Sequence, residues 1–113
     1  MQPTEFERMV FDSLLRDDPD EGLLRVQLDS VVVTKRDHTG HGLYSHLQVP
    51  PDVARVGSDR RYVQDVPKTH LLHPQLEAGA GAMLWLKDGV AVTLECYTFG
   101  GDWPGDESLF RVG

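Results

Sequence analysis

Residues 82–97 read AMLWLKDGVAVTLECY, so that Asp88-Gly89 stands between two apolar runs. Aspartate and glycine both tolerate the positive φ angles of a type I′ turn, and the twist of this turn matches that of the strands it joins. The stretch therefore predicts a β-hairpin. Its second strand carries Glu95 next to Cys96. An acid in an apolar strand either meets a polar partner or serves a function, so Glu95 is the first candidate site residue.

Near the N-terminus, an apolar stripe predicts one amphipathic helix from Thr4 to Arg16. Four apolar side chains recur at helical spacing: Phe6, Met9, Val10 and Leu14. Thr4 and Glu7 predict a capping box, in which each side chain bonds the backbone N–H of the other residue. Pro19 ends the helix because it cannot continue the helical hydrogen bonds.

The rest of the chain predicts strands joined by turns. The alternation of Leu24, Val26 and Leu28 with polar residues predicts a half-buried strand that continues to Thr34. Further strands are expected over residues 43–49, 60–66 and 108–112. The predicted fold is therefore α+β, with an N-terminal helix packed on an antiparallel, meander-like sheet of five or six strands, in a single domain over residues 1–113.

The composition is that of a globular protein, with 40% hydrophobic and 26% charged residues. The net charge is −7, and acids concentrate at the two ends: residues 1–22 carry seven acids and two bases, and residues 88–113 carry five acids and one base. This balance argues against binding to nucleic acid or to a membrane surface, which need a basic face. With one cysteine, no signal-peptide pattern and no long apolar run, a cytoplasmic location is expected.

Five histidines include two H-x-x-H pairs, His38/His41 and His70/His73, and the single His46. The pairs would supply three or four metal ligands if their segments met. On a strand, however, residues three apart point to opposite faces, and the H-E-x-x-H arrangement is absent. The histidines are interpreted as surface or hydrogen-bonded residues, with metal ligation as the alternative, and no metal or cofactor is predicted.

A two-residue turn with unbroken alternation assigns the hairpin side chains to faces. Glu95 is then expected beside Thr93, Tyr97 and Leu84, either as a general acid or base or as the partner of Arg60, Arg61 or a tyrosine hydroxyl. Cys96 is expected on the opposite face as a small core residue, since free cysteine is among the most buried residue types. That opposite face is expected to hold also Met83, Trp85, Val90, Val92 and Leu94.

A glycine-rich turn over residues 100–106 carries Trp103-Pro104. Exposed aromatic side chains beside glycines can recognise a partner. Tyr97, Asp102 and Trp103 therefore join Glu95 as candidate binding residues. The alternative is that Trp103 folds back and closes one end of the core.

Four motifs of the chain are similar to those of a family of small uncharacterised bacterial proteins, marked by a G-x-G-[FLY] hairpin and an L-E-x-[YF]-T…W-P tail. They are Thr39-Gly40-His41-Gly42-Leu43-Tyr44, Gly79-Ala80-Gly81-Ala82, Leu94-Glu95-Cys96-Tyr97-Thr98 and Trp103-Pro104. The resemblance spans residues 31–112. It implies no known activity, cofactor or catalytic residue, but it sets Glu95 and Trp103-Pro104 within a family pattern.

Taken together, these features favour a non-enzymatic protein-interaction module of the inhibitor, immunity or adaptor type. The expected surface combines Trp103 with the acids Asp102, Asp106 and Glu107. The expected partner is another protein, or a second copy bound through an edge strand. The alternative is a small-molecule or metal-binding domain, or an enzyme, with Glu95 as acid or base among some of these histidines: His41, His46, His70 and His73.

Overall fold

The computed structural model describes residues 1–63 and 70–113. Two helices come first, α1 (Glu5–Leu15) and α2 (Glu21–Asp29). The strands that follow are β1 (Val32–His38), β2 (Gly42–Gln48), β3 (Tyr62–Val63), β4 (Leu71–His73), β5 (Leu76–Lys87), β6 (Val90–Thr98) and β7 (Arg111–Val112), with the 3₁₀ turn η1 (Glu107–Leu109) before β7. Within these residues, neither helix has the length and apolar character needed to cross a membrane.

All the strands belong to one antiparallel sheet in the order β1-β2-β6-β5-β4-β7, and β3 also pairs with β5. The predicted α+β class is confirmed. The sheet has seven strands rather than five or six because β5 is long enough to pair with both β3 and β4. The chain departs from a meander where β2 pairs with β6. Of the strand predicted over residues 60–66, the structure has β3, and residues 64–66 lie outside the described residues.

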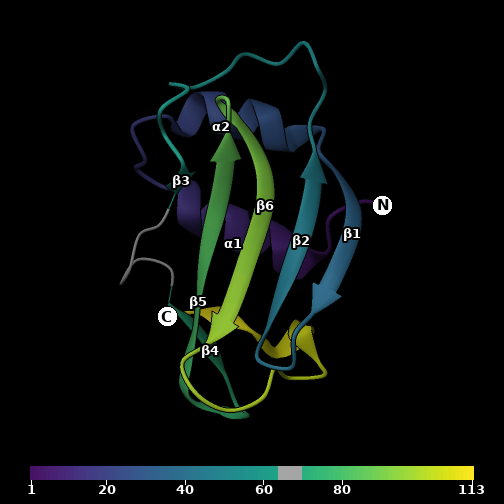
Figure 1. The fold of residues 1–113 in the computed structure, drawn as a ribbon. Helices are drawn as coiled ribbons and strands as arrows, with labels where there is room; N and C mark the ends of the chain where they lie inside the picture. Colours follow the sequence, from purple (N-terminus) through teal and green to yellow (C-terminus); the bar gives the residue numbers. More distant parts are fainter. Residues whose placement is uncertain (64–69) are drawn as a thin grey trace.

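Helices α1 and α2 both lie behind the sheet, and neither of them lies over its front (Figure 1). The core therefore forms between the helices and the inner face of the sheet. Its fully buried members come from both layers and include Val10, Leu14, Leu15, Leu24, Val33, Leu43, Leu84, Leu94 and Cys96. Cys96 is the buried core residue that the sequence predicts, and burial raises the pKa of its thiol well above the usual value.

Helix α1 begins as the sequence predicts. The Thr4 hydroxyl accepts from the Glu7 backbone N–H at 3.1 Å, and the Thr4 backbone N–H donates to the Glu7 carboxylate at 2.8 Å. This capping box satisfies two backbone donors that have no partner within the helix. After the helix, Asp17 adopts a left-handed φ of 63° and turns the chain toward α2.

The strand predicted from the alternation of residues 24–29 is wrong, because these residues form helix α2. The helix buries Leu24, Gln27 and Leu28, whereas Val26 is 60% exposed. Because the polar residue Gln27 lies between the buried leucines, the helical spacing of apolar residues cannot be recognised in the sequence. The exposed Val26 instead produces the alternation that is typical of a strand.

Gln27 is buried because three backbone groups satisfy its side-chain amide. Its nitrogen donates to the carbonyl oxygens of Ala54 at 3.0 Å and Gly89 at 2.9 Å. Its oxygen accepts from the Ala91 N–H at 2.9 Å. Helix α2 is thereby attached both to the hairpin turn and to the loop after β2.

The hairpin forms at the predicted turn, where Asp88 and Gly89 have φ angles of 52° and 82°. Within β6, Glu95 shares its face with Thr93 and Tyr97 as predicted, and Leu94 and Cys96 lie on the other face. The predicted faces of Met83, Leu84 and Trp85 in β5 are wrong, however. Leu86 pairs with Ala91 but Trp85 pairs with Thr93, so Val92 is an extra residue in β6. This β-bulge reverses the alternation beyond it. Leu84 therefore lies opposite Leu94 in the core, and the residues beside Glu95 on β5 are Met83 and Trp85.

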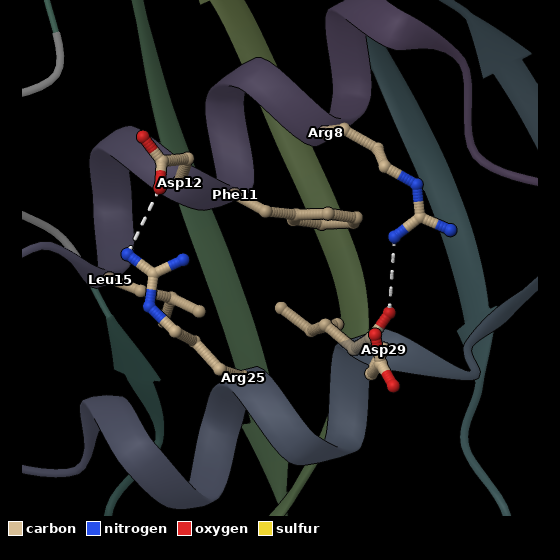
Figure 2. Close-up of a pocket in the computed structure, with 7 residues that line it drawn as sticks. Arg8, Phe11, Asp12, Leu15, Arg25 and Asp29 are labelled. Carbon is tan, nitrogen blue, oxygen red and sulfur yellow. Dashed lines mark hydrogen bonds and ion pairs between the residues drawn. The ribbon is translucent and has the colours of Figure 1, made fainter.

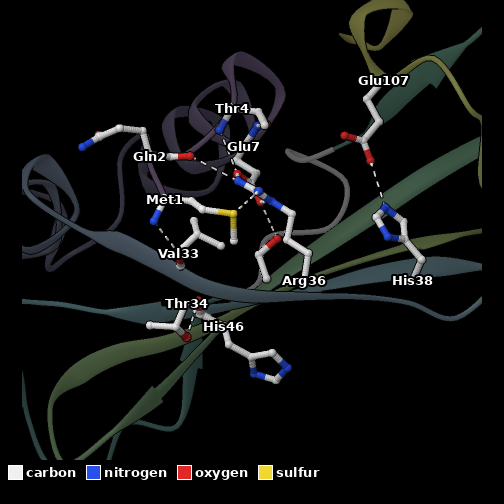
Figure 3. Close-up of polar contacts among 11 residues, drawn as sticks. Met1, Gln2, Thr4, Glu7, Val33, Thr34, Arg36, His38, His46 and Glu107 are labelled. Atoms are coloured by element: carbon white, nitrogen blue, oxygen red, sulfur yellow. Dashed lines mark hydrogen bonds and ion pairs between the residues drawn. The ribbon is translucent and has the colours of Figure 1, made fainter.

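A buried ion pair joins α1 to the first two strands (Figure 3). The Glu7 side chain is completely buried, and its carboxylate accepts from Arg36 of β1 at 2.7 and 3.0 Å and from the Ser45 hydroxyl of β2. Burial alone would raise the pKa of Glu7, but the hydrogen bonds from Arg36, Ser45 and Thr4 outweigh it and hold this pKa below 4.5.

We expect the substitution Glu7→Gln to destabilise the fold by about 3 kcal/mol at neutral pH, because Arg36 then lacks its charged partner. The pKa of Glu7 is lowered by folding, so the carboxylate stabilises the protein above 4.5, and this stabilisation is lost as the pH falls below it. The difference between the two proteins should therefore shrink toward about pH 3. Urea unfolding across this range measures it, with the exposed Glu5→Gln as control. A difference independent of pH would contradict the assignment.

Truncation by Gln27→Ala should lower the free energy of unfolding by about 2–4 kcal/mol, since three buried backbone groups lose their partners. The exposed neighbour Val26→Ala on the same helix should change it by less than about 0.5 kcal/mol. Urea denaturation of both variants provides the comparison. Equal stabilities would show that the Gln27 amide does not hold α2 in place.

Candidate functional site

The open face is the side of the sheet opposite the helices (Figure 1). Strand pairing brings its side chains into rows across the sheet. One row runs from Asp37 through Tyr44 and Glu95 to Met83, and the next runs from Lys35 through His46, Thr93 and Trp85 to Tyr62. Large aromatic residues remain accessible here, since Trp85 is 37% and Tyr62 49% exposed.

Glu95 lies in the middle of the open face between two aromatic donors. The Trp85 indole N–H donates to its Oε1 at 2.9 Å, and the Tyr44 hydroxyl donates to its Oε2 at 3.2 Å. The charge of Glu95, this hydrogen bond and slight burial together raise the pKa of Tyr44 above 10.0, so Tyr44 keeps its proton and stays a donor. The two bonds fix the plane of the carboxylate. Of the partners predicted for Glu95, the tyrosine hydroxyl is confirmed.

Two further aromatic rings lie over a glycine. A Cβ atom at Gly81 would approach the Phe99 ring to 2.8 Å and the Tyr97 ring to 2.9 Å. These rings contact each other edge to face, with centroids 5.6 Å apart. The absence of a side chain at Gly81 thus lets Tyr97 and Phe99 pack directly on the backbone of β5.

Residues from three of the motifs quoted above meet at this point of the sheet. Gly42, Tyr97 and Gly81 form one row across β2, β6 and β5. A Cβ atom at Gly42 would come within 2.3 Å of the Cys96 carbonyl oxygen, so no larger residue fits without a shift of the backbone. The spacing of these motifs is therefore accounted for by close backbone approach and ring packing beside Glu95.

The far end of the open face carries a charged group of three side chains. His46 Nε2 lies 2.9 Å from Asp37, and Lys35 Nζ lies 3.4 Å from the same carboxylate. The bond to His46, followed by Lys35, lowers the pKa of Asp37. The open face thus pairs its peripheral acid with a lysine and a histidine of its own.

Trp103, predicted as a candidate binding residue, packs inward. Its ring contacts Phe6 and Phe110 with centroids 5.8 and 5.0 Å apart, and its indole N–H donates to Glu107 at 2.8 Å. This placement agrees with the alternative that Trp103 closes one end of the core. Asp102 lies next to it in the exposed turn, 4.0 Å from His41.

The histidines lie apart from one another and have different neighbours. His73 is buried, with Nε2 2.8 Å from the Asp106 carbonyl oxygen, and His70 contacts the Phe99 ring. His38 Nε2 lies 3.8 Å from Glu107 (Figure 3). Over residues 1–63 and 70–113, no three His, Cys, Asp or Glu side chains are grouped so that they could hold a metal ion.

A hollow of about 270 Å³ lies between α1 and α2 (Figure 2). Both of its arginines are engaged within the chain: Arg25 pairs with Asp12 at 3.0 Å, and Arg8 donates to the Leu28 carbonyl oxygen at 3.4 Å. Because both arginines already have partners, this hollow offers a charged ligand less than the open face does.

Comparison of the chain with protein-family models, with curated proteins and with solved structures finds no match. The resemblance of the motifs to a family of small bacterial proteins stays a prediction. The structure brings Glu95 and Tyr97 together on the open face and places Trp103 and Asp102 at the end of the sheet, after β6.

Three residues of the open face could not be identified from the sequence: Tyr44, Tyr62 and Trp85. Tyr44 belongs to one of the motifs, but only strand pairing shows that it faces Glu95. The alternation predicts Trp85 on the opposite face, because the bulge at Val92 gives no strong local signal.

The pKa of Tyr44 tests this geometry directly. Glu95→Gln removes the negative charge that mainly raises this pKa, which should then fall toward 10.0. Titration of ¹³C-labelled tyrosine followed by NMR measures the change. Glu77→Gln, which removes an exposed acid from the same strand as Trp85, is the matched control and should leave the value as it is. An unchanged pKa in the Glu95 variant would contradict the contact.

Proposed function

We propose that the chain is a non-enzymatic module that binds another protein through the open face. The observation that carries this proposal is the exposure of Trp85 and Tyr62 beside an oriented carboxylate, Glu95, on a sheet face that neither α1 nor α2 covers. Tryptophan and tyrosine are enriched among the residues that contribute most to protein–protein binding. The convergence of Gly42, Gly81 and Tyr97 beside Glu95 further supports a role for this face.

The partner that fits best has a basic surface. The chain has a net charge of −7, which attracts positively charged proteins over a distance and speeds their association. A second copy of the chain would bring the same negative charge against this face. We therefore favour a basic partner over a homodimer, and a homodimer is one outcome that the experiment below detects.

The alternative of an enzyme with Glu95 as acid or base has less support. General acid–base chemistry needs a second reactive group near the carboxylate. In the described part of the chain, Glu95 instead receives hydrogen bonds from Trp85 and Tyr44, and the histidines contact other groups. We also propose a cytoplasmic location, because the only cysteine is a buried thiol and the chain has no second one for a disulfide.

The proposal predicts where a partner can be captured. A photo-crosslinking amino acid at Tyr62 should give a discrete crosslinked product in cells, whereas the same amino acid at Val26 on α2 should not. Trp85→Ala should reduce the Tyr62 product about tenfold or more, since a central interface aromatic contributes about 2 kcal/mol. Mass spectrometry identifies what is attached.

The outcomes separate the interpretations. A basic protein crosslinked from position 62 and lost with Trp85→Ala supports the proposal. A product consisting of two copies of the chain would replace the basic partner with a homodimer. Crosslinking from position 26 alone, or a product insensitive to Trp85, would refute the open face as the binding surface.

A further inference from the structure

Glu95 differs in its surroundings from the acids of the protein that pair with an arginine. Glu7 pairs with Arg36 at 2.7 Å, and Asp18 pairs with Arg60 at 2.6 Å. Across residues 1–63 and 70–113, no Lys, Arg or His nitrogen lies within ion-pair distance of the Glu95 carboxylate. Among the described residues, the Glu95 carboxylate therefore has two neutral hydrogen-bond donors and no cationic partner, which leaves it free to attract a cation.

The Glu95 carboxylate can accept further hydrogen bonds beside the two that it already receives. A carboxylate has about four acceptor sites, two on each oxygen. Trp85 uses one site on Oε1, and Tyr44 uses one site on Oε2. One site remains on each oxygen, which matches the two parallel N–H donors of a guanidinium group better than the single ammonium of lysine.

The flanking rings favour the same group. Trp85 and Tyr44 lie on the strands either side of β6, and Tyr62 contacts Trp85 edge to face at 6.0 Å. Aromatic faces attract cations, and the planar guanidinium stacks on them. Because Trp85 and Tyr62 are exposed, their rings are accessible to an incoming side chain.

We propose that Glu95 is the receptor for an arginine side chain of the partner, held by a bidentate ion pair with the carboxylate and by the rings of Trp85 and Tyr44. This inference rests on the proposed function and names the chemistry of its central contact. Trp85 and Tyr44 have a double role: each donates a hydrogen bond that orients the carboxylate, and each offers a ring beside it.

The test uses a small probe, so that it does not depend on the identity of the partner. Nα-acetyl-arginine N-methylamide is titrated into the full chain while the indole N–H signals are followed by NMR. The Trp85 signal should shift with saturation and a dissociation constant on the order of millimolar, whereas the Trp103 signal, bonded to Glu107, should not move. The lysine and citrulline amides serve as matched probes.

The variants sharpen the result. Glu95→Gln should lower the affinity for the arginine probe at least about tenfold, because the bidentate ion pair is lost. Glu77→Gln, with an exposed acid elsewhere on β5, should leave the affinity unchanged. The neutral citrulline probe should bind at least about tenfold more weakly than arginine, and the lysine probe should also be weaker.

Each contrary result overturns the inference. Equal binding of the arginine and citrulline probes would show that no ion pair forms. Equal binding of the arginine and lysine probes would show that the guanidinium geometry is not recognised. An unmoved Trp85 signal would show that the probe does not bind at this site. If Tyr62 crosslinks a protein but Glu95→Gln changes neither probe nor product, the protein-binding function stands and the arginine contact falls. If the probe binds at Glu95 but no protein crosslinks at Tyr62, the cation site stands and the proposed function falls.

Discussion

The buried carboxylate of Glu7 joins three parts of the fold that are distant in sequence. It completes the capping box with Thr4 at the start of α1, accepts two hydrogen bonds from Arg36 of β1 and accepts another from Ser45 of β2. Removing either partner would leave a polar group in the core without its bond, which is costly away from water. The helix is therefore fixed against the inner face of the sheet in one position.

This attachment has a consequence for the other side of the sheet. With α1 and α2 both on the inner face, the outward side chains of β2, β5 and β6 lie on the face that neither helix covers (Figure 1). A one-layer sheet of mostly polar outward residues would need no explanation. Here the outward rows contain three aromatic residues around Glu95, more than a solvated sheet face usually carries. These residues are Tyr44, Trp85 and Tyr97.

The parts of the fold that could be predicted from sequence are those set by local chemistry. Thr4 and Glu7 predict the start of α1, and Asp88-Gly89 predicts the hairpin, because each of these signals depends on contacts within a few residues. Helix α2 could not be recognised in this way. Gln27 is buried only because Ala54, Gly89 and Ala91 come to it from distant segments, and no local pattern shows that they will.

The candidate site could be predicted only in part, because its contacts also join segments that are distant in sequence. Glu95 and Tyr97 stood out as polar and aromatic residues of an apolar strand, but their neighbours depend on pairing between strands. The bulge at Val92 has a wider consequence: it works as a shift of reading frame within β6. Deleting Val92 would close the bulge and leave Thr93 opposite Trp85, so Leu94 would still face the core. Deleting a residue after Thr93 would instead turn every following side chain of β6 to the opposite face. Beyond the bulge, β6 can therefore change its side chains in evolution far more readily than its length.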